Sequence, residues 1–568
     1  MILINIFIEE HKALREINVR LNGSFEISYS NKILTLRKTE DTAEYYGGRY
    51  CSALIGPNGV GKSSILEILE LFKGEHDSRA IIVFYDEETN IYYVCSLNMT
   101  SAELKTIDSD SKCIVVQDNR KFLSSNHINL VKINSLAGSE DVLSFKKTSS
   151  SHFHHDLTIR ENLKNSVQQK KYFEKLLAYF KDSYERDEFM EEIAFEFVFA
   201  SSPVSIAERC REVLVSNEEL ITKWTKYTYD FKLRENKISH GTVFQRLLDI
   251  NLLSIISALA KTSSFEKEIL ASLLYQFDKT EHLSQRDVST SNRLRIALNN
   301  LPGTDASIFQ KTFSENENGK ASLSRENINY NALAQALEGL FEIFEEIATI
   351  LFDHCYDGLE LNLRSVKIDY YDVIQNLTAA INRLPSNIAS NIKWGWRGIS
   401  SGELARTHIR SESYHYLNST SGNKNNILIF DEADLYLHPE WQRTFLHEML
   451  YHLRSIEASR DIKTCQIIIC THSPIIISDF LASDITSLIK NEDGEIEITQ
   501  AYGFGNSIVD IYMKGMHIKS TFGEHARRKI NYLLKKAEQG ILSSADRNLI
   551  EKIPNHNARN FLLSHDKN

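Results

Sequence analysis

A glycine-rich motif near the N-terminus constrains the fold of this chain more than any other feature. The run Gly56-Pro-Asn-Gly-Val-Gly-Lys62-Ser63 matches GxxxxGK[ST] at every fixed position. It follows the apolar run Cys51 to Ile55 and precedes the amphipathic run Ser63 to Phe72. This context predicts a buried parallel strand, a phosphate-binding loop and a helix in direct succession. The chain is therefore expected to contain an α/β domain built around the loop.

The residue types of this loop suit a nucleotide with Mg²⁺. Glycines let backbone N–H groups wrap phosphates without a Cβ in the way, and the helix that follows presents its positive end to the same phosphates. Lys62 is expected to reach the β- and γ-phosphates, and Ser63 to ligate Mg²⁺. We therefore expect ATP and Mg²⁺ as cofactors. The predicted binding residues of the loop are Gly56, Pro57, Asn58, Gly59, Val60, Gly61, Lys62, Ser63 and Ser64.

Two later predicted strands end in polar residues of the kind that a hydrolytic site needs. The apolar run from Asn426 to Phe430 ends in Asp431 and Glu432. Asp431 is expected to hold Mg²⁺, and Glu432 to act as a general base on the attacking water. The run from Gln466 to Cys470 ends in Thr471-His472, where the histidine is expected to sense the γ-phosphate. The predicted catalytic residues are Glu432, Lys62 and His472.

A fourth motif, Ser400-Ser401-Gly402-Glu403, opens a helical run about 30 residues before Asp431. The order of motifs now resembles the ABC-type ATPases, including the SMC-like and RecF-like repair proteins. In that superfamily a signature loop, LSGGQ, binds ATP that is held by a partner subunit. The resemblance gives Ser400 the role of the signature serine and Gly402 that of the second glycine. Ser401 stands where the first glycine would be, and Glu403 stands where the glutamine would be. Because serine has less backbone freedom than glycine, how closely this loop approaches the γ-phosphate stays an open question.

The same resemblance implies further contacts. His438, shortly after the catalytic acids, belongs to a loop that faces the dimer partner in similar proteins. The Q-loop is expected at Asn134 and Ser135, with Gln117 as the alternative.

The adenine contact stays open between two places in the sequence. One is the turn with His11 and Lys12, and the other is Tyr45 or Tyr46, either of which could stack on the base.

The organisation of the chain follows from where these motifs stand. The fold class expected is α/β: an ABC-type P-loop ATPase head with a mixed sheet, N-terminal antiparallel strands and a large helical insertion between the loop and the signature. Residues 1–156 and 386–514 are expected to form the two parts of the head, 157–385 the insertion, and 515–568 a basic helical tail. In the first strand, alternation predicts one apolar face made of Ile2, Ile4, Ile6 and Ile8.

Within the middle region, one helix is marked by apolar residues that step by three and four, and these are Leu333, Leu337, Leu340, Phe344, Ile347 and Leu351. This pattern fits a helix facing a core or a dimerising arm. The polar stretch Asp278 to Asn331 is predicted as a long loop. The segment Lys146 to Asp156 is predicted as another loop, whose histidines are either solvated or bind a metal.

The composition of the chain, together with its apolar stretches, argues against several classes of protein. Asp plus Glu outnumber Lys plus Arg by 76 to 65, a net charge of −11, which argues against a surface that is basic all over. Seven cysteines without a CxxC pair argue against a disulfide framework. The N-terminal apolar run lacks the flanks of a signal peptide, and no stretch approaches the length of a membrane helix. A cytoplasmic protein without a membrane partner is expected.

The C-terminal tail carries ten Lys or Arg against five Asp or Glu from residue 515 onward. Its basic helix, with Arg527, Arg528 and Lys529, fits a solvated face, a protein docking site or a contact with a phosphate backbone. The segment after Thr471-His472 is short for a Toprim nuclease and shows no nuclease pattern. We therefore expect an ATPase without a nuclease domain of its own.

A narrower resemblance concerns residues 501–530. The turn Gly503 to Asn506, a helix, and Phe522-Gly-Glu524 opening another helix resemble the PtuA-type ATPases of Septu and retron-associated antiphage systems. That resemblance implies a homo-oligomer with an HNH nuclease partner and, in retron versions, a reverse transcriptase with its RNA–DNA, so direct contact with nucleic acid is open. The alternatives are a RecF- or SMC-like repair ATPase acting on DNA ends or gaps, and a scaffold that binds ATP without turnover.

Overall fold

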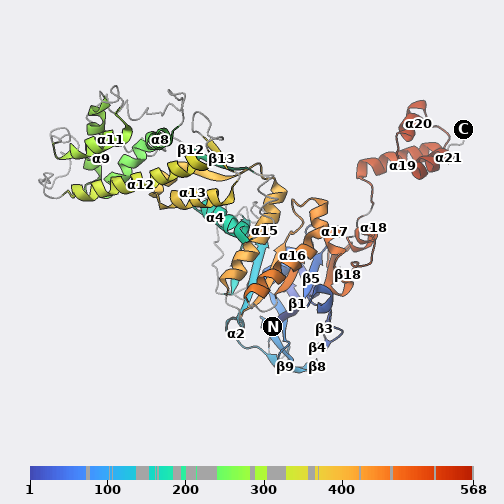
Figure 1. Ribbon diagram of the computed structural model, residues 1–568. Helices are drawn as coiled ribbons and strands as arrows, with labels where there is room; N and C mark the ends of the chain where they lie inside the picture. The colour runs from blue at the N-terminus through green and yellow to red at the C-terminus, as the bar shows by residue number, and fades with distance from the viewer. Residues whose placement is uncertain are drawn as a thin grey trace, which may run out of the picture. The chain divides into compact units, whose positions relative to one another are not determined.

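A computed structural model describes most of the chain (Figure 1). The described residues are 1–71, 77–100, 103–104, 106–135, 153–159, 162, 166–182, 194–199, 213, 239–281, 288–303, 328–355, 365–368, 370–420, 424–460, 465–516, 518 and 520–565. They divide into two compact units. The first, called the head, comprises 1–179 and 400–568, and the second comprises 180–399.

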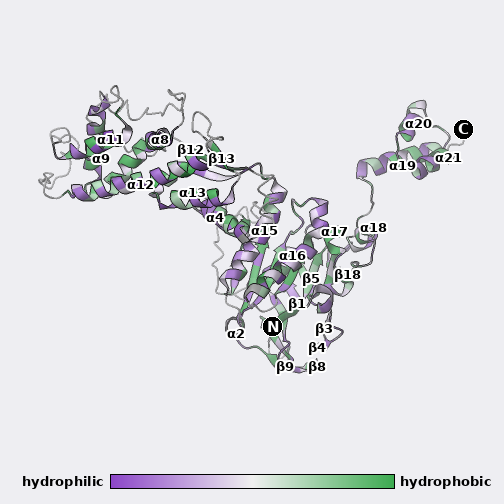
Figure 2. Ribbon diagram, viewed as in Figure 1, coloured by the Kyte–Doolittle hydropathy of each residue, from purple (hydrophilic) through white to green (hydrophobic). Residues whose placement is uncertain are grey.

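A seven-stranded sheet forms the centre of the head, in the order β11-β10-β15-β16-β5-β17-β18. All neighbours are parallel except β17 and β18. The strands are β5 (Cys51–Ile55), β10 (Ile128–Asn134), β11 (His154–Asp156), β15 (Asn425–Asp431), β16 (Gln466–Cys470), β17 (Ile485–Lys490) and β18 (Ile496–Thr499). The inner strands are buried on both faces, which explains their continuous apolar runs (Figure 2). This is an α/β arrangement, with a mostly parallel sheet at the centre.

Two apolar cores cover the two faces of this sheet. On one face lies α1 (Lys62–Glu70), together with an antiparallel sheet, around Leu54, Ile429 and Ile468. On the other face lie α15 (Ser401–Ser419), α16 (Pro439–Arg460) and α17 (Pro474–Ile477) around Leu428 and Phe430. Alternate residues of β15 therefore point to opposite cores, and Asp431 follows Ile429 on the face that α1 covers.

The antiparallel sheet, in the order β2-β1-β6-β7-β9, consists of β1 (Ile2–His11), β2 (Leu14–Arg20), β6 (Arg79–Asp86), β7 (Ile91–Leu97) and β9 (Lys112–Val115), the last parallel to β7. The predicted apolar row of β1 was wrong. Ile6 and Ile8 face the central sheet with Leu3, whereas Ile2 and Ile4 face the opposite core. The reason is a register shift against β6 between Leu3 and Asn5, which rotates the following residues by one position.

Smaller elements complete the head. A sheet of β3 (Phe25–Ser30), β4 (Ile33–Lys38) and β8 (Thr106–Ser109) covers the outer face of the antiparallel sheet, and α2 (Asn119–Ser125) precedes β10. The predicted loop Lys146 to Asp156 needs correction, because its end forms β11 on the edge of the central sheet. Residues 146–152 lie outside the described residues. Among the described residues no group of three or more His, Cys, Asp or Glu side chains stands ready to hold a metal.

The second unit contains helices and a three-stranded antiparallel sheet. The helices are α8 (His240–Ala260), α9 (Glu266–Lys279), α11 (Thr290–Asn299), α12 (Tyr330–Cys355), α13 (Tyr371–Arg383) and α14 (Ser386–Ala389), and the strands, in the order β13-β12-β14, are β12 (Ala194–Phe199), β13 (Ser365–Ile368) and β14 (Ile392–Arg397). Helix α4 (Ser166–Asp182) contains the border between the units. Within the predicted loop Asp278 to Asn331, α11 is a helix capped by the Ser289 hydroxyl, and residues 304–327 lie outside the described residues.

Two helices of the second unit test predictions made from the sequence, one on a core-facing helix and one on membrane-length apolar stretches. All six stepping residues of α12 are buried, and α12 packs against α8 and α13, so the core-facing alternative is confirmed. Helix α8 is long and apolar enough to cross a membrane, which corrects the expectation that no such stretch exists. However, 78% of its apolar window is buried inside the protein, as in the core helix of a globular unit.

The C-terminal residues form three short helices after α18 (Ile508–Asp510) and the π-helical turn Ile511–Gly515. They are α19 (Glu524–Glu538), α20 (Ser544–Glu551) and α21 (His556–Ser564). A small core around Leu533, Ile550 and Leu562 joins them. Much of the predicted basic character of α19 is paired, since Glu524 binds Arg527 and Arg528.

Candidate functional site

Three parallel neighbours of the central sheet bring the predicted catalytic residues to one edge. In the order β15-β16-β5, the carboxyl ends of the strands lead into Asp431, Thr471 and the glycine-rich loop. Asp431 stands beside Cys470 in register, and Cys470 stands beside Leu54. Residues more than 350 positions apart in sequence therefore meet where ligands bind in open α/β sheets.

The loop between β5 and α1 has a backbone that requires its glycines. Gly56, Gly59 and Gly61 have φ values of 145°, 80° and 92°. A Cβ on Gly56 would lie 2.4 Å from the Leu488 carbonyl oxygen, and one on Gly61 would lie 2.8 Å from a Leu14 methyl group. The glycines thus serve both the left-handed conformation and the close approach of neighbouring chain segments.

Lys62 is the first residue of α1 and is buried inside the loop. Its Nζ donates to the carbonyl oxygens of Gly56 (2.9 Å) and Pro57 (3.3 Å). Burial lowers the pKa of Lys62, while the nearby carboxyl groups of Asp431, Glu432 and others oppose that shift. The loop therefore holds a cation at its centre, and residues 57–59 and Ser63 of the same segment are exposed. Val60 is buried, whereas Ser64 is half-buried.

Asp431 is buried, and neither of its carboxylate oxygens has a hydrogen bond among the described residues. A buried carboxylate in this state fits a cation. Its Oδ2 lies 3.2 Å from Nζ of Lys132, a residue that sequence reasoning missed. Mg²⁺ binds through one or two carboxylates together with substrate phosphates, so Asp431 with the Ser63 hydroxyl is a donor set that suits it.

Glu432 has a positive φ of 54°, which is rare for a residue with a side chain. Such a conformation costs about 1–3 kcal/mol and tends to persist at functional sites. It turns the chain directly after β15, so that Glu432 is half-buried at the same edge as Asp431.

The Thr471-His472 pair is held by Asp434, a second residue that sequence reasoning missed. Asp434 Oδ1 accepts from Thr471 Oγ1 (2.6 Å) and from the His472 backbone N–H (3.0 Å). Burial, and next the positive charge of Lys62, lowers the pKa of His472. The only sequence signal for Asp434 is its place two residues after the paired acids.

The signature motif begins α15. Ser400 is exposed and caps the helix: its hydroxyl accepts from the Glu403 N–H (3.2 Å), and the Glu403 carboxylate accepts from the Ser400 N–H (2.6 Å). Glu403 is thus committed to a capping box. Ser401 is exposed beside it, so the positive end of the helix is open to solvent.

Gly402 connects the signature motif to the loop that contains His438. A Cβ on Gly402 would lie 2.7 Å from the Tyr436 carbonyl oxygen and 2.9 Å from the Trp441 ring. Packing within the chain therefore requires this glycine. His438 is exposed, and its Nδ1 accepts from the Glu440 N–H at 3.3 Å.

The Q-loop candidates occupy different sheets. Asn134 is the last residue of β10 and stands beside Asp431 in register, while Ser135 is buried and donates to the Ala405 carbonyl on α15 (3.5 Å). Gln117 follows β9 on the edge of the antiparallel sheet and is exposed. Of these candidates, the structure brings Asn134 to Asp431.

The adenine candidates are also separated. Lys12 contacts Glu67 on α1, and His11 Nε2 lies 3.7 Å from the same carboxylate, so the turn after β1 adjoins the helix of the loop. Tyr45 and Tyr46 precede β5 and lie near its amino end. The Tyr46 hydroxyl donates to Asp484 (3.1 Å). That position is the opposite edge of the sheet from the glycine-rich loop.

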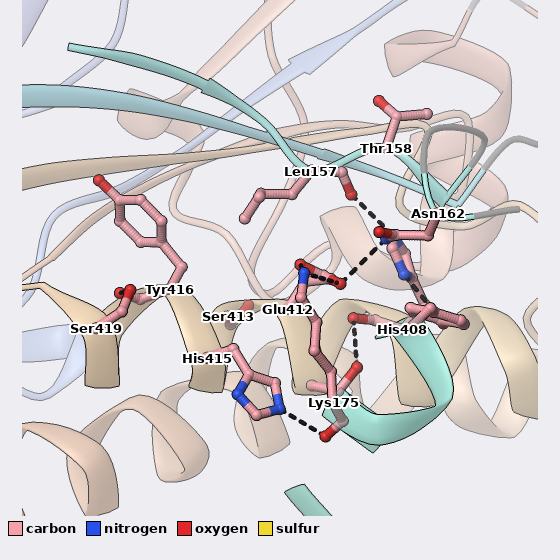
Figure 3. A network of polar contacts seen from close by, with 12 residues as sticks. Leu157, Thr158, Asn162, Lys175, His408, Glu412, Ser413, His415, Tyr416 and Ser419 are labelled. Atoms are coloured by element: carbon pink, nitrogen blue, oxygen red, sulfur yellow. Dashed lines mark hydrogen bonds and ion pairs between the residues drawn. The ribbon is translucent and has the colours of Figure 1, made fainter. Parts of the chain in front are cut away.

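Behind the signature motif, α15 is joined to α4 by a buried polar network (Figure 3). Glu412 is buried and accepts from Lys175 Nζ (3.0 Å) and from Asn162 Nδ2 (3.1 Å). His408 is also buried and contacts the Tyr172 hydroxyl (3.2 Å) on α4. These contacts fix α15 near its middle, about two to three turns after the open end that carries Ser400.

Comparison with known proteins decides the family. The family described as AAA ATPase domain matches residues 1–477, which include the loop, both acids and His472. The chain belongs to the AAA ATPase domain family. This assignment supports an ATPase activity and implies nucleotide binding.

A second comparison finds similarity to the Septu protein PtuA of Bacillus thuringiensis, at 27% identity over 165 residues. The aligned region covers 26% of this chain and 36% of PtuA. The match thus spans about a third of the length of that curated relative.

Proposed function

We propose that this chain is an ATP-hydrolysing subunit of an antiphage defence complex, in which ATP-dependent pairing of heads regulates a separate effector nuclease. The observation that carries the ATPase part is the meeting of Lys62, Asp431, Glu432 and His472 at the carboxyl edge of three adjacent strands. The defence part rests on the similarity to PtuA and on the resemblance of the segment after His472 to PtuA-type ATPases.

Each residue has a role in this proposal. Lys62 and the backbone N–H groups of its loop bind the phosphates, and Ser63 with Asp431 holds Mg²⁺, which screens the charge that develops in hydrolysis. Glu432 accepts a proton from the attacking water. His472, held through Asp434, contacts the γ-phosphate, so that its position depends on whether the nucleotide is ATP or ADP.

Pairing of heads follows from the open end of α15. Ser400 and the helix N-terminus form an anion site that the nucleotide bound to Lys62 of the same chain does not need. We propose that they cap the nucleotide of a second copy, with His438 at the same interface. Residues 180–399 then act as a helical insertion of the head. The complex would include an HNH nuclease and, in retron versions, a reverse transcriptase with its RNA–DNA.

Two measurements test the proposal. The first compares ATP turnover of the parent protein with Lys62→Ala and Glu432→Gln, and follows the mass of Glu432→Gln by light scattering with and without ATP. We expect turnover in the parent alone and an ATP-dependent increase in mass. Turnover in Lys62→Ala equal to that of the parent would contradict the ATPase site, and an unchanged mass would contradict pairing.

The second measurement is affinity purification of the tagged protein from its own host, with mass spectrometry and nucleic-acid staining. Recovery of an HNH nuclease would support the defence complex. Recovery of recombination or replication proteins instead would favour a repair ATPase acting on DNA ends or gaps.

A further inference from the structure

Lys132 stands out among the charged residues near the candidate site, because it lies within a strand. It belongs to β10, pairs in register with Ile429, and keeps only 14% of its side chain exposed. A lysine in a parallel strand next to the buried centre of a sheet loses hydration and needs a compensating charge.

Asp431 supplies such a charge. Lys132 Nζ lies 3.2 Å from Asp431 Oδ2, and the Asp431 side chain is 1% exposed. Because Lys132 is paired with Ile429, its ammonium reaches along the strand toward the carboxyl edge, on the face that α1 covers. Lys62 also acts on Asp431 from the loop, so two lysines and one buried carboxylate share this edge.

The contact between Lys132 and Asp431 is electrostatic and not directional. The Asp431 oxygens have no hydrogen bond among the described residues, although the ammonium is close. An ion pair of this kind neutralises the carboxylate without saturating its lone pairs. It is therefore suited to a carboxylate that has to exchange one cation for another.

We propose that Lys132 is a positioning residue that competes with Mg²⁺ for Asp431. In the nucleotide-free head, Lys132 neutralises the buried carboxylate and keeps it in place. With Mg–ATP bound, Asp431 would serve as a ligand of the metal and would no longer be the counter-ion of Lys132. Lys132 thereby raises the Mg²⁺ concentration that nucleotide binding requires. This inference rests on the ATP site proposed above.

The test measures nucleotide binding, independently of turnover. A fluorescent ATP analogue is titrated with Mg²⁺ in the parent, in Lys132→Met, in Lys132→Arg, and in Lys171→Met, which removes an exposed lysine of α4. We expect Lys132→Met to lower the Mg²⁺ concentration for half-maximal binding about fivefold or more, within the usual range for coupled ligands. Lys132→Arg and Lys171→Met should stay close to the parent. Binding in EDTA should change little in any variant.

Three outcomes would overturn the inference. The Mg²⁺ requirement of Lys132→Met could equal or exceed that of the parent, which would make the ion pair structural. Second, Lys132→Met could bind the ATP analogue more weakly than the parent in EDTA, which would make Lys132 a phosphate ligand that does not compete with Mg²⁺. Third, Lys171→Met could lower the Mg²⁺ requirement as much as Lys132→Met does. If Lys132→Met does not fold, Lys132→Gln, which keeps a donor for Asp431, replaces it. Failure of the ATP site itself is distinct: the parent would then bind the analogue no better than Lys62→Ala.

Discussion

Acidification should destabilise the head through two buried histidines on neighbouring helices. His408 on α15 is fully buried between the Tyr172 hydroxyl and the Leu157 carbonyl, and burial lowers its pKa to about 3. His452 on α16 is buried, and burial together with the positive charge of Arg410 lowers its pKa to about 4. The ordinary histidine pKa is about 6.5.

The sign and size of the change in the free energy of unfolding follow from the difference in proton uptake between the folded and the unfolded chain. Between pH 7 and pH 5 the unfolded chain binds a proton at each histidine and the folded chain does not, so the free energy of unfolding falls as the pH falls through 6.5. Each histidine removes about 2 kcal/mol over this interval. Asp484 acts in the opposite direction, because burial raises its pKa to about 6, and it restores about 1 kcal/mol. The net loss from these three groups is about 3 kcal/mol.

The assay compares His408→Gln with the parent by urea-induced unfolding at pH 7, 6 and 5, followed by circular dichroism. Glutamine stays uncharged, so the variant should lose stability at pH 7 but show about 2 kcal/mol less pH dependence. His447→Gln, which changes an exposed histidine of α16, is the control. An equal pH dependence in His408→Gln and the parent would refute the reasoning, as would an equal reduction in the control.

Three further substitutions test separate contacts. Gly402→Ala should lower the stability by about 1–3 kcal/mol in thermal unfolding, because its Cβ would lie 2.7 Å from the Tyr436 carbonyl oxygen. Lys175→Met should lower the stability by about 1–3 kcal/mol, measured by urea unfolding, because it leaves the buried carboxylate of Glu412 without its cation. Asp434→Ala should lower ATP turnover about tenfold to a hundredfold while nucleotide affinity stays near that of the parent, because Thr471 and His472 lose their shared acceptor.

Each of these substitutions has a matched control. Gly339→Ala places a methyl group in open space on a helix and should leave the stability unchanged or slightly higher. Lys171→Met and Asp493→Ala remove exposed charges and should have little effect. A loss in a control that equals the loss in its partner would show that the named contact does not explain the effect.

The sequence was most informative where the signal is local. The strand Cys51 to Ile55, the loop after it and α1 could be predicted because the glycines, the lysine and the apolar runs lie within about 20 residues. The strands before Asp431 and Thr471 could be predicted because parallel strands buried on both faces read as continuous apolar runs. Their order in the sheet could not be read from these runs alone.

Features that depend on a distant partner escaped prediction. The register shift in β1 arises from its pairing with β6, and β11 forms because β10 offers an open edge. Lys132 interrupts an apolar run and, without its neighbour, carries no information about Asp431. Helix α11 was hidden in a polar stretch because Leu294 and Leu298 are too few to set a period.

The network between α4 and α15 has a consequence for the connectivity of the chain. The second unit begins at residue 180 within α4 and ends at residue 399, next to the residue that caps α15. Because α4 and α15 are fastened together by Glu412 and His408, the chain leaves and re-enters the head at the same pair of helices. The entropic cost of closing a loop grows slowly with its length, by about 0.6 kcal/mol for each doubling. The stability of the head therefore depends little on how many residues are inserted there. The second unit can therefore vary in length at little entropic cost while the central sheet of the head stays the same.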